Sequence, residues 1–153
     1  TALYERGGDS VAFNMVREHF ALLASIVRDH DGAVVKTIGD AVMAAFGDPA
    51  DAVKAALDMQ ARIAGQELVL KLGIHAGASV VVNLNDRLDY FGSTVNMAAR
   101  LQGQSEGADI VLSRAVADDP AVRQLIAAVP AGEESVALKG FADPISFVRL
   151  RPG

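Results

Sequence analysis

The sequence predicts an α+β domain, because helical and β-type segments alternate along its 153 residues without an internal repeat. The first segment, Asp9 to His30, places apolar residues three or four positions apart, as one face of an amphipathic helix requires. Two short β-type runs follow over 33–38 and 41–46. Only Gly39 and Asp40 separate these runs, and this spacing is typical of a tight hairpin.

The later segments continue the alternation. Pro49 lies near the start of a second amphipathic helix, and residues 68–76 alternate in polarity as a strand does. We expect residues 80–84 to form the hairpin partner of that strand, followed by a polar turn over 85–92. The remaining predicted elements are a helix over 93–104, a strand over 109–112, a helix over 120–128, and a last hairpin with strands over 136–138 and 145–150.

The order of the first elements indicates a particular α+β architecture. One strand added in front of α-β-β-α-β gives the split βαβ, ferredoxin-like pattern, with an antiparallel sheet and helices on one face. That fold places its first strand inside the sheet, so a chain that starts at the first helix leaves a gap there. We therefore expect a single domain over residues 1–153 that lacks its opening strand, as a piece of a longer protein would.

Composition excludes several classes of function. The net charge is −5 with acidic and basic residues interspersed, so no basic patch offers a site for nucleic acid. The chain contains no cysteine, which excludes disulfides, thiolate metal sites and cysteine nucleophiles. No apolar run approaches the ~20 residues of a membrane span, so any membrane attachment would come from segments outside this chain. A polyanionic ligand would need a few well-placed cations or a metal.

Two segments contain candidate functional residues. Asp40 lies beside a glycine at the tip of the predicted hairpin, where an exposed carboxylate suits Mg²⁺, although turn preference alone would also explain it. Asn96 and Arg100 are four positions apart and share one helix face. An amide and a guanidinium suit a sugar ring and its phosphate, although exposed residues of these types are often only solvated. The same applies to Lys139, which precedes a glycine.

Four segments together resemble the catalytic domains of class III nucleotidyl cyclases. Residues 36–40 are similar to the family's Lys-Thr-Ile-Gly-Asp segment, and residues 89–100 to its Asp-x-x-Gly-x-Thr-Val-Asn-x-Ala-x-Arg helix. Residues 72–77 resemble the strand between them, and residues 138–140 resemble a late phosphate-binding turn. The segments occur in the family's order, and the resemblance extends over essentially the whole chain.

The resemblance implies an adenylate cyclase domain that converts ATP to 3′,5′-cyclic AMP and pyrophosphate in a signalling protein, in the cytoplasm. Its active site would lie between two protomers packed head to tail, with two Mg²⁺ or Mn²⁺ ions. One protomer would supply Asp40 to the metals. The other would supply Asn96 to orient the ribose, Arg100 to stabilise charge at the transferring phosphorus, and Lys139 to bind the triphosphate.

Two further residues of the resemblance bear on the choice of base. Lys36 is only a donor and ionised Asp89 is only an acceptor, so together they complement the edge of adenine. Guanine presents the reverse pattern, and guanylate cyclases of this family usually carry Glu and Cys at the matching positions. The pair therefore favours ATP over GTP.

The chain departs from the family at its start. Thr1 matches the threonine of the turn that follows the opening strand, and we expect it among the substrate-binding residues. The family's first metal-binding aspartate lies on that strand, ahead of this sequence. Because one carboxylate is insufficient for two Mg²⁺ ions, we expect this chain by itself to be inactive or crippled.

Two other interpretations remain open. The first is a cyclase-like regulatory module that binds ATP or only dimerises; a natural loss of the opening strand would favour it, whereas the retained site residues argue against it. A diguanylate cyclase is suggested by Gly7-Gly8-Asp9, but its signature needs a hairpin there, whereas this sequence becomes helical at once. We predict that His75 is a structural histidine and not a catalytic base.

Overall fold

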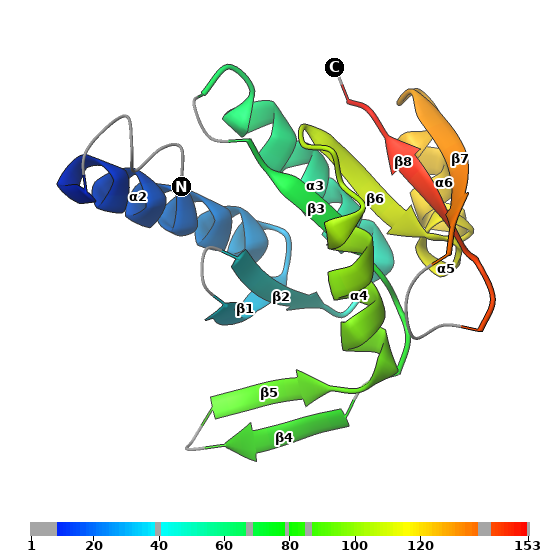
Figure 1. The fold of residues 1–153 in the computed structure, drawn as a ribbon, viewed down its shortest axis with the longest axis horizontal. Coiled ribbons are helices and arrows are strands. Elements are labelled where there is room, and N and C mark those ends of the chain that lie inside the picture. The colour runs from blue at the N-terminus through cyan, green and yellow to red at the C-terminus, as the bar shows by residue number, and fades with distance from the viewer. Residues whose placement is uncertain are drawn as a thin grey trace.

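The computed structural model describes residues 9–38, 41–66, 69–78, 80–84, 87–137 and 142–152 (Figure 1). Helices and strands alternate in it as the sequence predicts. The helices are α2 (Asp9–Asp29), α3 (Pro49–Ile63), α4 (Ser93–Gly103), α5 (Arg114–Ala117) and α6 (Pro120–Ile126). The strands are β1 (Gly32–Ile38), β2 (Ala41–Phe46), β3 (Lys71–Ile74), β4 (Val80–Leu84), β5 (Arg87–Phe91), β6 (Asp109–Ser113), β7 (Ala131–Val136) and β8 (Ile145–Leu150).

The predicted first hairpin is confirmed. Strands β1 and β2 are antiparallel, and Ile38 pairs with Ala41, so two residues link them. Helix α3 then starts where the sequence indicates, because Asp48 accepts a hydrogen bond from the Ala50 N–H at 3.0 Å and Pro49 occupies the first turn. These local interactions explain why the sequence predicts this part of the chain well.

The predicted pairing of residues 68–76 with residues 80–84 is wrong. Strand β3 instead pairs in parallel with β6, and β4 pairs with β5 over residues predicted to form a turn. Leu84 pairs with Arg87, so β4 and β5 form a two-residue hairpin, the most local antiparallel pairing available to this segment. That hairpin leaves β3 free to join the central sheet.

The central sheet has the order β3-β6-β8-β7. Strands β6 and β8, and β8 and β7, pair antiparallel, and only β3 runs parallel to its neighbour. Strand β7 begins at Ala131, five residues before the predicted start of that strand. The predicted α+β class with a largely antiparallel sheet is therefore confirmed.

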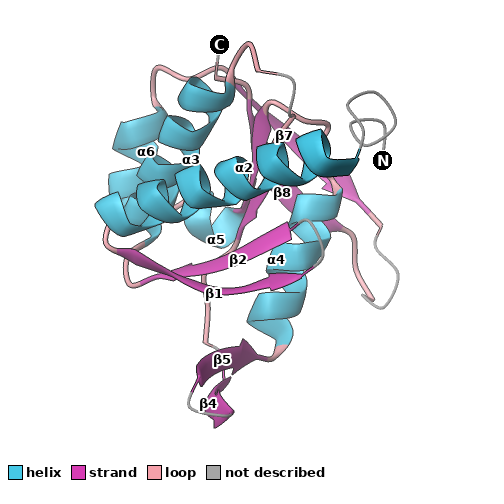
Figure 2. Ribbon diagram, turned by 90° about the vertical axis from the view of Figure 1, so that its left-hand side faces the viewer, coloured by secondary structure: helices cyan, strands magenta, loops and turns pink. Residues whose placement is uncertain are grey.

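Helices pack on both faces of the central sheet, with an apolar cluster on each face. One face packs against α3, α5 and α6, through Ile110 and Leu112 of β6 and Val148 and Leu150 of β8. Residues between these point the other way, and Val111 and Phe147 pack against Leu101 of α4. Helix α4 thus crosses the face opposite to α3, so the helices are not confined to one face of the sheet as predicted. Helix α4 also stands between the sheet and the β4–β5 hairpin (Figures 1 and 2).

The sheet has a gap where the sequence predicts the missing strand. Strands β1 and β2 form their own two-stranded sheet, separate from the sheet that begins with β3. Helices α2 and α3 pack against both parts through Leu23, Ile26 and Met59, with Phe46 of β2 and Leu72 of β3 at the edges of this cluster. Among the described residues no strand lies between β2 and β3.

Candidate functional site

Helix α4 presents the two predicted catalytic residues on its surface. Asn96 and Arg100 are both exposed, one turn apart on the same side of the helix. Gly92 precedes the helix with φ of 119°, a conformation that glycine adopts without strain, and its carbonyl accepts a hydrogen bond from the Asn96 N–H. No hydrogen bond or ion pair joins either side chain to another described residue.

The helix is held tightly behind this exposed pair. Near its start, the Thr94 hydroxyl donates to the carbonyl of Ala78, in the loop after β3. Near its end, Leu101 is fully buried, and the backbone lies directly on Gly73 of β3. A Cβ at Gly73 would lie 2.8 Å from the carbonyl carbon of Leu101 and closer still to the Gln102 nitrogen. The backbone contact fixes the distance between the helix and the sheet.

This contact predicts that Gly73→Ala destabilises the domain. The added methyl group would meet the backbone of α4, which cannot rotate away as a side chain can, and such overpacking costs typically about 2 kcal/mol. Urea unfolding followed by circular dichroism would measure this loss. Gly132→Ala is the matched control, because Gly132 also lies in a strand and has open space where its Cβ would be. Equal stability of the two variants would contradict the close contact.

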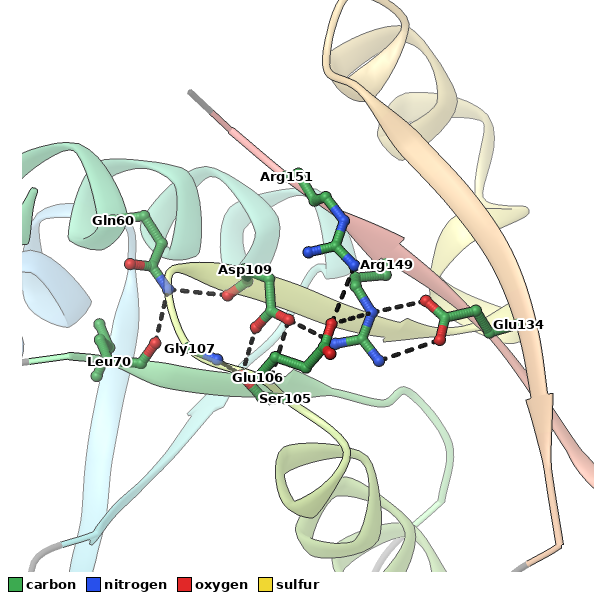
Figure 3. A network of polar contacts seen from close by, with 9 residues as sticks. All are labelled: Gln60, Leu70, Ser105, Glu106, Gly107, Asp109, Glu134, Arg149 and Arg151. Carbon is green, nitrogen blue, oxygen red and sulfur yellow. Dashed lines mark hydrogen bonds and ion pairs between the residues drawn. The ribbon is translucent and has the colours of Figure 1, made fainter.

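A buried network fixes the loop that leads out of α4 (Figure 3). Arg149 of β8 is 4% exposed and Asp109 of β6 is 1% exposed. The Arg149 guanidinium contacts the Asp109 carboxylate at 2.5 Å and donates from Nε to Glu134 at 2.6 Å. The Asp109 carboxylate also accepts hydrogen bonds from the Ser105 hydroxyl and from the Glu106 N–H. The network therefore joins β6, β7 and β8 to the end of the helix that carries Arg100.

Hydrogen bonding and burial have opposite effects on the pKa values of Asp109 and Arg149. Burial alone would raise the pKa of Asp109, but hydrogen bonds from Ser105, the Glu106 N–H and Arg149 outweigh it and hold that pKa below its usual value. The hydrogen bond to Glu134, followed by that to Asp109, raises the pKa of Arg149. Both groups are therefore charged at neutral pH.

The two residues predicted to read the base lie on neighbouring strands. Lys36 is half-buried in β1 and lies opposite Met43 in the hairpin. Asp89 lies in β5, where its backbone pairs with Val82. Strands β1 and β5 contact each other, so the fold brings together the two strands that carry these residues. The side chain of Asp89 is outside the description.

Three predicted site residues lie outside the described residues: Thr1, Asp40 and Lys139. Of these, Asp40 is the predicted metal ligand. Within the described part of the chain, no group of three or more His, Asp or Glu side chains is arranged to hold a metal ion. The assignment of Asp40 as a metal ligand thus remains a prediction from the sequence.

The positions of His75 and of helix α2 concern two further points of the sequence analysis, the role of this histidine and the diguanylate cyclase interpretation. His75 lines the gap beside β3, and burial lowers its pKa. Helix α2 begins at Asp9, where the diguanylate cyclase signature would need the turn of a hairpin. The start of this helix therefore argues against that interpretation.

The Asp109–Arg149 network is the part of the site region that sequence reasoning missed. Asp109 and Arg149 are 40 positions apart, and neither belongs to a motif. The one available signal is their position, because each lies in an otherwise apolar strand where a charge needs a partner.

The sequence is similar to that of known cyclases. The family model described as "Adenylate and Guanylate cyclase catalytic domain" matches residues 1–140. The chain is 32% identical to an adenylate cyclase of Glutamicibacter nicotianae, over 94% of this chain and 34% of that protein. It is 34% identical to adenylate cyclase 1 of Rhizobium meliloti, over 67% of this chain and 19% of that protein. The chain thus spans about a third or less of these two relatives.

Solved structures agree on the fold. One from a study of Trypanosoma brucei adenylate cyclases in their monomeric state superposes with a TM-score of 0.86 at 21% identity, over 99% of this chain and 85% of that one. An adenylate/guanylate cyclase/hydrolase from Silicibacter pomeroyi gives 0.79 at 26% identity, over 97% and 90%. Among the described helices, none has both the length and the apolar character of a membrane span. The chain belongs to the family of adenylate and guanylate cyclase catalytic domains.

Proposed function

We propose that this domain forms 3′,5′-cyclic AMP and pyrophosphate from ATP at a site shared by two head-to-tail copies. The observation that carries the proposal is the pair on α4. Asn96 and Arg100 are exposed, share a face, and stand on a helix whose backbone is fixed from behind. An amide and a guanidinium on a fixed backbone are the groups that a ribose and a phosphoryl centre require.

The roles of the pair follow from their chemistry. Asn96 hydrogen-bonds the ribose and holds its 3′-hydroxyl in line with the α-phosphorus, since the reaction depends on that orientation. Arg100 donates to the phosphoryl oxygens, and this contact strengthens as negative charge grows there in the transition state. As the 3′-oxygen bonds to the α-phosphorus, pyrophosphate leaves and the hydroxyl proton is released. Lys139 and Thr1 contact the triphosphate.

The selection of ATP rests on Lys36 and Asp89. Their strands contact each other, as a shared base pocket requires. Lys36 donates to the N1 acceptor of adenine, and Asp89 accepts from its 6-amino group. A guanine base would present a donor toward the ammonium group and an acceptor toward the carboxylate, so both contacts would be repulsive.

Metal ions supply charge neutralisation when they are bound. Asp40 would hold Mg²⁺ or Mn²⁺ from this chain, since hard divalent cations prefer carboxylate oxygens. Because a pair of ions needs further carboxylates, we propose that the second metal-binding aspartate lies on a strand ahead of residue 1.

The proposed function is tested by assaying two forms with ATP and with GTP: the 153-residue chain, and a version that carries the preceding strand. We expect the longer version to form cyclic AMP and little cyclic GMP. The shorter chain should be at least about 100-fold slower, because its metal site is incomplete. ATP binding without turnover in both forms would favour the regulatory-module alternative.

The base assignment has its own test in the longer version. Lys36→Glu combined with Asp89→Cys should lower kcat/KM for ATP by at least about tenfold, because two complementary contacts are removed and one becomes repulsive. Steady-state kinetics with both nucleotides would measure this change. Lys54→Glu is the control, because Lys54 is an exposed lysine on α3. Unchanged ATP turnover in the double variant would show the assignment to be wrong.

A further inference from the structure

The loop of residues 104–108 joins the end of α4 to β6, and its backbone has an unusual conformation. Gly107 has φ of 98°, which glycine adopts freely, but Ala108 has φ of 59°, which a residue with a Cβ atom disfavours. Residues other than glycine keep such a conformation only where the surrounding structure enforces it, and they cluster at functional sites. The shape of this loop is therefore set by its contacts and not by its own backbone preference.

Buried hydrogen bonds hold the loop from both ends (Figure 3). The Gln60 side chain of α3 is 7% exposed and donates to the backbone carbonyl of Asp109 at 2.8 Å. The carboxylate of Asp109 accepts from the Ser105 hydroxyl and, at 3.0 Å, from the Glu106 N–H. Arg149 donates to the same carboxylate. The loop therefore turns around the Asp109 side chain, and Arg149 holds that side chain in place.

The loop is also bonded to the last turn of α4. The Ser105 N–H donates to the carbonyl of Gln102 at 3.1 Å, and Arg100 lies in that last turn. A continuous series of contacts thus leads from the turn that carries Arg100, through Ser105, to Asp109 and Arg149.

Asp109 and Arg149 lie beneath α4 on the same face of the sheet. Asp109 is two residues from Val111 on β6, and Arg149 is two residues from Phe147 on β8, so each pair shares a face. Val111 and Phe147 pack against Leu101 of α4. The guanidinium carbon of Arg149 lies 5.6 Å from the centre of the Phe147 ring. The network therefore also contacts the apolar cluster on which the last turn of α4 rests.

A buried ion pair is better suited to fixing a position than to adding stability. Its desolvation offsets its attraction, so apolar residues of the same volume would stabilise the fold as well or better. Hydrogen bonds, however, are directional and fix the atoms that they join. Position matters for the proposed reaction, because misplacing a catalytic group by about 1 Å can lower the rate about 100-fold.

We propose that Asp109, held by Arg149, is a positioning residue that sets the place of Arg100 against the transferring phosphoryl group. The inference rests on the proposed function. Asp109 acts through Ser105 and the 104–108 loop and not by contact with the nucleotide. Its loss should therefore affect the transition state, which depends on the placement of Arg100, more than the binding of ATP.

A double-mutant cycle in the strand-bearing version tests this role. Asp109→Asn keeps the size of the side chain but removes its charge, and it should lower kcat at least about tenfold while the KM for ATP changes less than about threefold. In the Arg100→Ala background the same change should lower kcat less than about twofold, because the group that it positions is already absent. Equal losses in both backgrounds would indicate a general structural effect and overturn the inference.

Two further variants separate positioning from stability. Val122→Ala is the matched stability control, because Val122 is fully buried on the face of the sheet opposite α4. It leaves a cavity but should keep the kcat of the folded protein within about twofold of the wild-type value. Ser105→Ala keeps the ion pair and should lower kcat at least about threefold, again without further loss beside Arg100→Ala. If circular dichroism shows Asp109→Asn to be unfolded, the Ser105→Ala cycle decides, and additive losses in it would reject the inference.

Hydrogen exchange with mass spectrometry provides a readout that needs no activity. Asp109→Asn should speed exchange in residues 101–106 at least about fivefold and leave residues 120–126 of α6 unchanged. Unchanged exchange in residues 101–106, in a protein whose wild-type form makes cyclic AMP, would refute the inference and leave the proposed function intact. A strand-bearing wild-type protein that makes no cyclic AMP would instead refute the proposed function, and the inference with it.

Discussion

Replacing Arg100 by alanine is expected to lower kcat by at least about 100-fold in the strand-bearing version of the domain. The guanidinium is exposed and free of other described partners, so its main interaction would be with the nucleotide. That interaction grows with the charge on the transferring phosphoryl group, so KM should change only a few-fold. Steady-state kinetics with ATP would measure both parameters.

The matched control for this variant is Arg123→Ala. Arg123 is also an exposed helical arginine, but it lies on α6, and its one ion pair among the described residues is with Asp118, at 3.6 Å. Its loss should leave kcat within about twofold, as for other surface substitutions. A similar kcat for both variants would remove Arg100 from the proposed mechanism.

Arg149→Met is expected to lower the free energy of unfolding by about 3 kcal/mol at pH 7. The substitution keeps the aliphatic bulk but leaves the Asp109 carboxylate, 1% exposed, without its cation. Ser105 and the Glu106 N–H would still donate to it, so its desolvation would be only partly compensated. Urea unfolding monitored by circular dichroism would measure the loss.

The loss of unfolding free energy caused by Arg149→Met should become smaller at acidic pH. In the wild-type domain the folded pKa of Asp109 lies below its unfolded value, so the contribution of this group is complete above the usual Asp pKa of about 3.9 and is lost as pH falls through the folded pKa. Without Arg149 that pKa rises, and a neutral carboxyl tolerates burial better. The deficit of Arg149→Met should therefore shrink between pH 7 and about pH 4.

Arg151→Met provides the control for Arg149→Met. Arg151 is 60% exposed and pairs with Glu106, which is 62% exposed. Exposed pairs contribute about 1 kcal/mol or less. Equal losses in the two variants, or a deficit for Arg149→Met that grows in acid, would contradict the buried network.

Short-range signals explain what the sequence predicted correctly. The start of α3 is set by Asp48 and Pro49, and the first hairpin by its two-residue link. Helix α4 follows from a run of helical spacing after Gly92. Each of these features depends on residues within one turn of helix or one hairpin, which a single sequence displays.

Long-range pairing explains what the sequence did not predict. The alternation of residues 68–76 identified a strand, but its partner β6 lies more than thirty positions away. Strand β7 was mostly missed because Glu133 and Glu134 look like loop residues, although Glu134 reaches back to Arg149 across the ladder. A charged residue such as Glu134, whose ion-pair partner is distant in the sequence, therefore looks like a solvent-exposed loop residue when only its neighbours are considered.

In the candidate site too, local motifs could be predicted from the sequence, whereas long-range contacts could not. Residues Asn96 and Arg100 were found from a motif, and the fold confirms their shared, exposed face. The same fold brings the strands of Lys36 and Asp89 into contact. The supports behind the site, Gly73 and the Asp109–Arg149 pair, carry no motif and emerge only from packing.

Complementation between two inactive variants tests the shared site most directly. In the strand-bearing version, Asp40→Asn and Arg100→Ala should each be nearly inactive alone, because each homodimer has two defective sites. Mixed in equal amounts, half of the dimers are heterodimers with one intact site, so about a quarter of the wild-type activity should return. A mixture no more active than its components would show that Asp40 and Arg100 of different copies do not serve the same nucleotide.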